Sequence, residues 1–156
     1  MTLPEIRNKI SELYTKWTGN SVGEIKELPL SGSNRTYFRV FDKHSTFIAT
    51  YNTDKEENVA FFYLAQQLKD AGVNVPEVLF KDVESGIYFQ QDLGDENLFD
   101  YITKGEDRSE EAIFETYKKV IDQMPKLQYE ASKGMDYSYC YPRKAFDKQS
   151  IQWDLN

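Results

Sequence analysis

The first twenty residues of the chain place an apolar side chain at every third or fourth position. These side chains share one face of a helix: Leu3, Ile6, Ile10, Leu13 and Trp17. Such spacing is typical of an amphipathic helix that buries one side. Pro4 suits the first turn of this helix and Gly19 suits its end, so the pattern predicts a helix over residues 3–17.

Three short segments that follow are typical of β-strands. They span residues 22–30, 35–41 and 46–51, and they are rich in β-branched and aromatic residues. In the second segment, Phe38 and Val40 alternate with their neighbours, so we expect these two side chains to share one face of a sheet. Because the connections are short, the three strands are expected to be antiparallel neighbours.

A second amphipathic helix is predicted over residues 53–72. Its apolar stripe has helical spacing: Phe61, Leu64, Ala65 and Leu68. Two more strands follow, over residues 75–82 and 86–93. A helix that connects the third strand to the fourth would cover one face of the sheet. The order of elements therefore predicts an α+β fold with a five-stranded, mainly antiparallel sheet, a packed helix and extra helices at both ends.

The rest of the chain has a mostly helical pattern. A short helix is expected near residues 96–104, and a longer one over residues 109–124 with an interruption or kink at Pro125. A tyrosine-rich connector over residues 135–143 then leads to a last stretch with apolar periodicity.

Glu57 is a carboxylate on the side of the second helix that carries the apolar stripe, since it lies four residues before Phe61. In the same arrangement Asn58 points elsewhere. Glu57 has two interpretations. It either lies against the N-terminus of its own helix, where the dipole and free N–H groups favour an anion, or it pairs with a cation on the facing strand, because an unpaired buried carboxylate is costly.

Composition restricts the function classes. The chain has 156 residues, of which 40% are hydrophobic and 29% charged, as expected for one globular domain. Its net charge of −7 argues against nucleic acid or an anionic membrane surface as a partner. No apolar run approaches the roughly 20 residues of a membrane span, and the first residues lack a signal-peptide stretch, which favours the cytoplasm. The single cysteine, Cys140, is not expected to be catalytic.

Three segments in order carry a family resemblance. They are LSGSNRTYFRV, ENVAFFYLAQQLKDAGVNVPEVL and FQQDLGDENL, which lie within residues 22–105. Together they resemble the N-terminal lobe of the aminoglycoside phosphotransferase and choline kinase-like enzymes, which are relatives of the protein kinases, and most of all the branch similar to bacterial kinases of cell-wall amino sugars. The resemblance implies a nucleotide-binding lobe over residues 1–105 and a helical segment over 106–156 that leads into a C-terminal lobe.

The loop between the first two strands is a candidate phosphate site. Ser31, Gly32 and Ser33 have little side-chain bulk, so backbone N–H groups can approach an anion closely. Asn34 and Arg35 add donors, and arginine can pair bidentately with phosphate. A plain β-turn has a similar composition. In the family that the chain resembles, this loop covers the nucleotide phosphates.

One position departs from the family pattern. The resemblance implies a lysine on the third strand that holds the α- and β-phosphates and pairs with the helix glutamate. Spacing places Thr50 there, and a neutral hydroxyl cannot supply the charge. We expect Arg35 to substitute for the lysine, with Arg39 as the second candidate; otherwise nucleotide binding is weakened.

The segment after the fifth strand is a candidate adenine site. The resemblance implies that backbone groups of Gln91 and Leu93 hydrogen-bond the edge of the base. Asp92 and Asp95 are then expected to be solvated or to cap the following turn. The implied cofactor is ATP or GTP with Mg²⁺, whose ligands are expected on the C-terminal lobe.

The predicted function is the nucleotide-binding N-terminal lobe of a small-molecule kinase. The acceptor would be a hydroxyl of a sugar, amino sugar or aminoglycoside-like compound. Because the implied catalytic Asp and Asn lie beyond residue 156, this chain is expected to be an inactive fragment that is covalently linked to a C-terminal lobe. Two alternatives remain: a pseudokinase-like module that binds a ligand without catalysis, and a protein-interaction domain that binds no nucleotide.

Overall fold

A computed structural model of the chain describes residues 1–29, 32, 34–104 and 109–155. These residues form two compact units. The first unit comprises Met1–Ala65, Pro76–Asp92 and Asp136–Asn156, and the second comprises Gln66–Val75 and Leu93–Met135.

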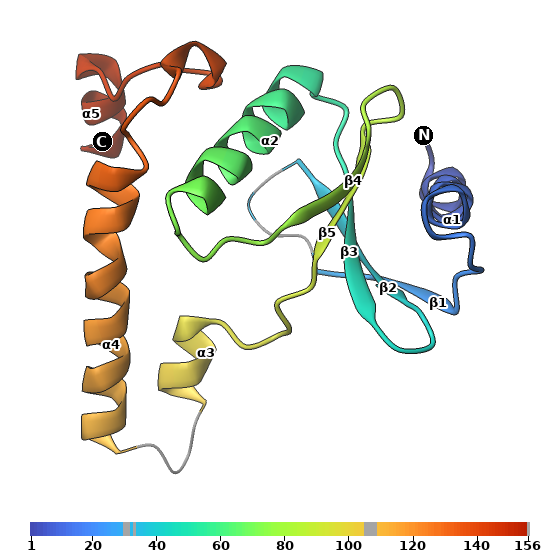
Figure 1. Cartoon of the computed structure of the whole chain (residues 1–156), viewed down its shortest axis with the longest axis horizontal. Coiled ribbons are helices and arrows are strands. Elements are labelled where there is room, and N and C mark those ends of the chain that lie inside the picture. The colour runs from blue at the N-terminus through green and yellow to red at the C-terminus, as the bar shows by residue number, and fades with distance from the viewer. Residues whose placement is uncertain (30–31, 33, 105–108, 156) are drawn as a thin grey trace. The chain divides into compact units, whose positions relative to one another are not determined.

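In the described part of the chain, five strands of the first unit form one sheet in which every pairing is antiparallel. The strands are β1 (Glu24–Glu27), β2 (Thr36–Phe41), β3 (Thr46–Tyr51), β4 (Val78–Asp82) and β5 (Ile87–Gln91). Their order across the sheet is β1-β2-β3-β5-β4 (Figure 1). The prediction of an α+β fold with a five-stranded antiparallel sheet is confirmed.

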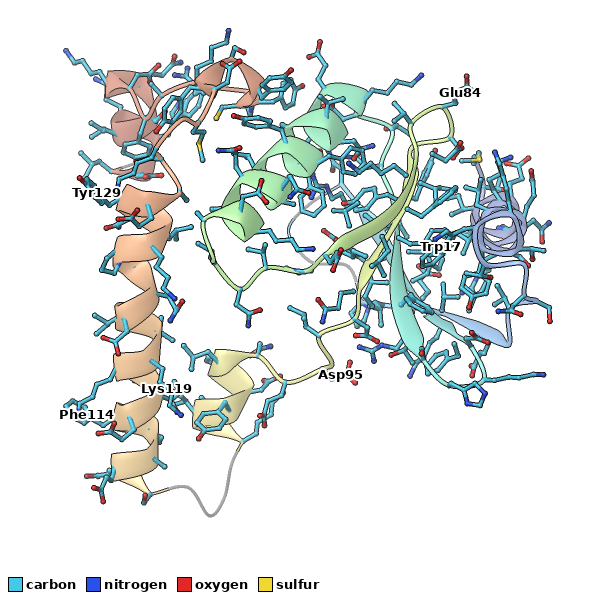
Figure 2. The ribbon with its side chains drawn as sticks, in the orientation of Figure 1. Trp17, Glu84, Asp95, Phe114, Lys119 and Tyr129 are labelled. Carbon is cyan, nitrogen blue, oxygen red and sulfur yellow. The ribbon has the colours of Figure 1, made fainter. Side chains whose placement is uncertain are left out.

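Helix α1 (Leu3–Thr18) packs against one face of the sheet (Figure 1). Phe38 and Val40 share one face of β2 as predicted, and both are fully buried in the core under this helix. Trp17 extends that core along the sheet, and Figure 2 shows it between α1 and the strands. Its ring lies 5.4 Å from that of Phe47 and 5.5 Å from that of Phe89. Aromatic packing therefore joins the helix to β3 and β5.

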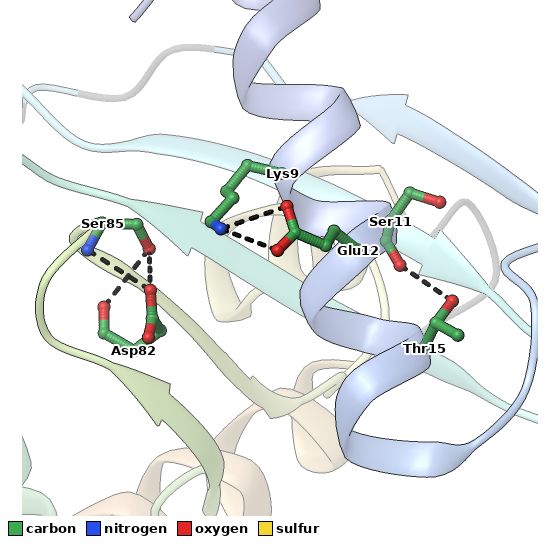
Figure 3. Close-up of polar contacts among 6 residues, drawn as sticks. All are labelled: Lys9, Ser11, Glu12, Thr15, Asp82 and Ser85. Carbon is green, nitrogen blue, oxygen red and sulfur yellow. Dashed lines mark hydrogen bonds and ion pairs between the residues drawn. The ribbon is translucent and has the colours of Figure 1, made fainter.

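Short-range polar contacts support α1 and the turn between β4 and β5 (Figure 3). On the exposed side of α1, Lys9 and Glu12 form an ion pair of 2.9 Å. In the turn, the hydroxyl and the backbone N–H of Ser85 both donate to the Asp82 carboxylate. The hydroxyl of Ser85 is the main cause of the lowered pKa of Asp82.

The opposite face of the sheet carries the first part of helix α2 (Lys55–Asp70). The rings of Phe61 and Phe62 lie 5.2 and 5.1 Å from the ring of Tyr88, a residue of β5. The expectation that Asn58 points away from the core is wrong, since Asn58 is 2% exposed. In contrast, Phe61 is only half-buried. The face that meets the sheet therefore begins with a polar residue, for which the structure provides polar partners.

The second unit is mainly helical. It contains α3 (Leu98–Thr103), α4 (Glu110–Pro125) and a π-helical turn η1 (Lys126–Glu130). The predicted interruption at Pro125 is confirmed, because the α-helix ends there and the wider turn follows; proline has no N–H for the helical ladder. Exposed apolar side chains run along α4, of which Figure 2 labels Phe114.

The segment after Met135 belongs to the first unit and contains η2 (Tyr137–Tyr139) and α5 (Lys148–Asp154). Across the residues that the structure describes, no helix has the length and apolar character needed to cross a membrane.

Gly86, in the turn before β5, is expected to be the glycine whose replacement costs most stability. Its φ is +71°, and a Cβ there would lie 2.2 Å from the backbone oxygen of Asn52. Gly19 has a similar φ of +76° but open space around it. Gly19→Ala should therefore cost about 1–2 kcal/mol for the left-handed conformation alone, whereas Gly86→Ala should cost clearly more. Urea unfolding of both variants measures the difference, and equal losses would contradict the close approach.

Candidate functional site

An ion pair joins the start of β2 to helix α2. Arg35 Nη2 lies 3.1 Å from Glu57 Oε1, and the two side chains are 13% and 37% exposed. The Arg35 guanidinium also lies over the ring of Phe61, 5.0 Å from its centroid, which adds a cation–π contact. Of the two interpretations of Glu57, the pairing with a cation is confirmed, but the cation lies just before β2 and not on a strand. The prediction that Arg35 supplies the charge expected near Glu57 agrees with this contact.

Asn52, just after β3, holds the other oxygen of Glu57. Its side-chain amide donates to Glu57 Oε2 at 2.6 Å and to Asn58 Oδ1 at 3.2 Å. Asn58 donates back to the backbone oxygen of Asn52 at 3.1 Å. The backbone N–H of Asn52 donates to the carbonyl of Gly86. Buried polar groups are costly unless they are paired, so this reciprocal pairing fixes the start of α2 against the ends of β3 and β5.

Asp54 caps helix α2. Its Oδ1 accepts from the Glu57 N–H at 3.0 Å, and its Oδ2 accepts from the Tyr141 hydroxyl at 2.9 Å. The Glu57 N–H is the main cause of the lowered pKa of Asp54, and the Tyr141 hydroxyl is the second. Because Asp54 neutralises the helix N-terminus, the side chain of Glu57 remains available to Arg35 and Asn52.

Thr50 occupies the middle of the same face of the sheet. It is fully buried in β3, opposite Tyr37 of β2 and Tyr88 of β5. Burial raises the pKa of Tyr88 to about 12, which keeps its hydroxyl neutral at physiological pH. Two charged side chains also act on Tyr88: Arg35 lowers its pKa and Glu57 raises it, so both members of the ion pair lie near this face of the sheet. In the described residues, no three carboxylate, histidine or cysteine side chains are grouped to hold a metal ion.

Arg39, the second candidate for the phosphate cation, is paired with Asp92. Arg39 Nε lies 2.7 Å from Asp92 Oδ2, and its Nη2 donates to Oδ1 at 3.1 Å. Only 12% of the Arg39 side chain and 6% of the Asp92 side chain are exposed. The expectation that Asp92 is solvated or caps a turn is wrong, because this carboxylate, which directly follows β5, is buried and paired with Arg39. This two-bond pair fastens β2 to the end of β5.

The candidate phosphate loop is described only in part. Ser31 and Ser33 lie outside the described residues. Gly32 is exposed, and a Cβ at this position would meet open space. Asn34 is also exposed. Neither packing nor a positive φ requires glycine at position 32.

At the candidate adenine site, the backbone N–H of Gln91 donates to the carbonyl of Glu77 at 2.9 Å. This hydrogen bond restricts any contact of Gln91 with a base to its carbonyl oxygen. Leu93 belongs to the second unit, where it is 63% exposed. Asp95, labelled in Figure 2, is exposed in the same unit.

Sequence reasoning missed Asn52, Asp54 and Tyr141. Two of these carry a local signal. Asn52 Oδ1 accepts from the Asp54 N–H at 3.0 Å, a turn that asparagine favours. Asp54 precedes Glu57 by three residues, the spacing of a capping box. Tyr141 has no such signal, because it lies 87 residues from its partner Asp54.

Comparison with known proteins found no matching family model and no matching curated protein. The function is therefore inferred from the arrangement of these side chains.

Breaking the Arg39–Asp92 pair from one side is expected to be strongly destabilising. Arg39→Met leaves a buried carboxylate without its cation, and such changes cost about 3–5 kcal/mol. Arg39→Met combined with Asp92→Leu removes both charges and should recover much of that loss. Urea unfolding of the single and double variants measures the coupling, and additive losses would contradict it.

Asp54→Asn is expected to remove a pH-dependent part of the free energy of unfolding. Asparagine can still cap helix α2, so the capping hydrogen bond is kept. The pKa of Asp54 is lowered in the folded protein. Its ionised form therefore stabilises the fold above the pKa of an unfolded aspartate, about 3.9, and this contribution is lost as the pH falls through the lower folded value. The wild type should be more stable than Asp54→Asn at neutral pH, and the difference should vanish in acid.

Urea midpoints from neutral pH downward test this. Asp154→Asn is the matched control, an exposed residue of α5. A difference between the wild type and Asp54→Asn that stays constant with pH would show that Asp54 does not act through its charge.

Proposed function

We propose that the chain is the nucleotide-binding N-terminal lobe of a small-molecule kinase, with ATP or GTP as phosphoryl donor and a hydroxylated sugar-like acceptor. The observation that carries the proposal is the Arg35–Glu57 ion pair of 3.1 Å beside an antiparallel five-stranded sheet. Protein kinases pair a cation from the sheet with a glutamate of the adjoining helix and use that cation to hold nucleotide phosphates.

In this chain, the cation would come from the loop before β2 instead of from β3. Thr50 leaves the usual position neutral, while Arg35 reaches Glu57 from the segment that the family resemblance assigns to the phosphates. Glu57 and Phe61 hold the guanidinium, so little side-chain entropy remains to be lost on binding. Arginine also offers several donors, and can contact a carboxylate and a phosphate at once.

Gly32 supports a ligand near this loop. Its backbone and packing would accommodate a larger residue, since a Cβ would meet no atom within 4 Å. A glycine there lets backbone N–H groups approach an anion closely. Gly32, Ser33, Asn34 and Arg35 would then hold the phosphates, and the carbonyl of Gln91 with the backbone of Leu93 would contact the base. A bound nucleotide would supply the transferable phosphoryl group, and the lobe would contribute positioning and charge neutralisation.

A non-catalytic binding module is the second candidate. The observation that favours it is Thr50, which is neutral and fully buried where the kinases carry a lysine. In such a module the Arg35–Glu57 pair would serve only to dock α2 on the sheet.

Nucleotide titration of Arg35 variants tests the proposal. Arg35→Met keeps an apolar stem against Phe61 but removes the charge, so Mg-ATP affinity should fall about ten- to a hundredfold, the value of one charge-assisted phosphate contact. Arg35→Lys keeps the charge and should lose less. Calorimetry on the full-length protein and on residues 1–156 measures both.

Arg7→Met is the matched control, because Arg7 forms its ion pair with Glu27. Equal nucleotide affinity of the wild type and Arg35→Met would reject Arg35 as the phosphate cation and favour the non-catalytic module. The chain alone is expected to transfer no phosphate to glucosamine or kanamycin. Robust magnesium-dependent transfer by residues 1–156 would contradict the assignment of catalysis to a second lobe.

A further inference from the structure

A cavity of about 520 Å³ lies in the first unit, between the first turns of α2 and the tyrosine-rich segment near η2. Its lining contains none of the residues assigned to the nucleotide. The lining residues are Lys55, Glu56, Val59, Ser138, Tyr139, Cys140, Tyr141, Pro142 and Lys144. A volume of this size suits a small molecule.

The aromatic walls of the cavity are held in place by other residues of the first unit. The ring of Tyr139 stacks on that of Tyr63, with 4.3 Å between centroids and an angle of 15°. The hydroxyl of Tyr63 accepts from the backbone N–H of Asp136, and that of Tyr141 donates to Asp54. Tyr139 is still 46% exposed although Tyr63 covers one side of its ring. A fixed ring with an accessible face favours a planar, aromatic ligand.

The charged walls favour an anion. Lys55 and Lys144 face a single glutamate, Glu56, which leaves one net positive charge among the lining residues. Within the described part of the chain, neither lysine forms an ion pair with a carboxylate. Two carboxylates lie beside the cavity. Asp54 accepts from Glu57 and Tyr141, and Asp136 accepts from the Ser138 N–H at 2.9 Å and interacts electrostatically with Lys144 without forming an ion pair with it.

We propose that this cavity binds a small aromatic carboxylate, with its ring on Tyr139 and its carboxylate held by Lys55 and Lys144. The single net charge of the lining matches a monoanion. The contact with the Tyr139 ring and the contact with the two lysines are independent requirements. A ligand that lacks either an aromatic ring or a carboxylate should therefore bind more weakly. The proposal does not depend on nucleotide binding.

Cys140 provides a direct readout, since it lines the cavity and is the single cysteine of the sequence. The rate of its alkylation by N-ethylmaleimide, a neutral reagent, can be followed by mass spectrometry on the full chain. Indole-3-acetate, indole-3-acetamide and tryptamine present the same ring with a negative, neutral and positive group. Indole-3-acetate should slow alkylation, the amide should need about tenfold higher concentration for the same protection, and tryptamine should protect least.

Three substitutions identify the groups that bind the probe. Lys55→Gln and Lys144→Gln should each raise the indole-3-acetate concentration that gives half-protection, by about three- to tenfold, and Tyr139→Leu should raise it as well. Lys148→Gln, in α5 and outside the cavity, is the matched control and should change nothing. Protection is taken as the ratio of rates with and without probe in each variant, so an altered thiol reactivity cancels.

Three results would overturn the proposal, and two of them concern the wild type. One is the absence of protection of Cys140 by indole-3-acetate at millimolar concentration, and the other is equal protection by all three probes. Protection that survives both lysine substitutions unchanged also counts against it, because the anion would then be bound elsewhere.

Discussion

The pairing of Asn52 with Asn58 is the contact on which the rest of the first unit depends. Asn52 ends β3 and Asn58 starts the buried side of α2, and both are 2% exposed. Each amide donates to the other residue, so neither is left unpaired in a region where an unpaired polar group is costly. The close approach of Gly86 to the Asn52 backbone completes the arrangement. Without a side chain at position 86, the β4–β5 turn can lie directly against this pair.

This polar anchor determines where the charged groups of α2 lie. The Asn52 amide holds one oxygen of Glu57 and leaves the other to Arg35, while Asp54 caps the helix. The first turn of α2 thus separates two carboxylates with different roles, one facing the loop before β2 and one facing Tyr141. Because both are attached to the same helical turn, the nucleotide site and the tyrosine-lined cavity are both proposed at the N-terminal end of α2.

The second charged contact joins Arg39 to Asp92. Here the buried cation stabilises the fold, because it is held by two bonds to a buried carboxylate. Arg35 and Arg39 are themselves almost equally enclosed, with 13% and 12% of their side chains exposed, but their partners differ in contact with solvent. Arg39 is held by two bonds to a carboxylate that is 6% exposed, whereas the partner of Arg35, Glu57, is 37% exposed. A cation whose partner is in contact with solvent can bind a further anionic ligand at a smaller desolvation cost than a cation whose partner is buried. By this criterion Arg35 is better suited than Arg39 to bind a phosphate.

The periodicity of apolar residues was sufficient to predict most of the elements of the first unit: α1, the five strands and the presence of α2. These elements follow from local spacing, since a face that is apolar at period 3.6 or 2 must be buried somewhere. The same spacing placed Glu57 on the stripe side of α2, and the family resemblance added Arg35 as a candidate for the same site. The spacing misplaced Asn58 and Asp92, because a polar residue is predicted to be exposed until its buried partner is known.

The tertiary structure supplies these partners. Asp92 pairs with Arg39, 53 residues away in the chain, and Tyr141 pairs with Asp54, 87 residues away. Only the folding of the sheet, of α2 and of the tyrosine-rich segment brings them together. For Arg39 and Asp92, the desolvation that makes the pair necessary exists only once the tertiary structure excludes water.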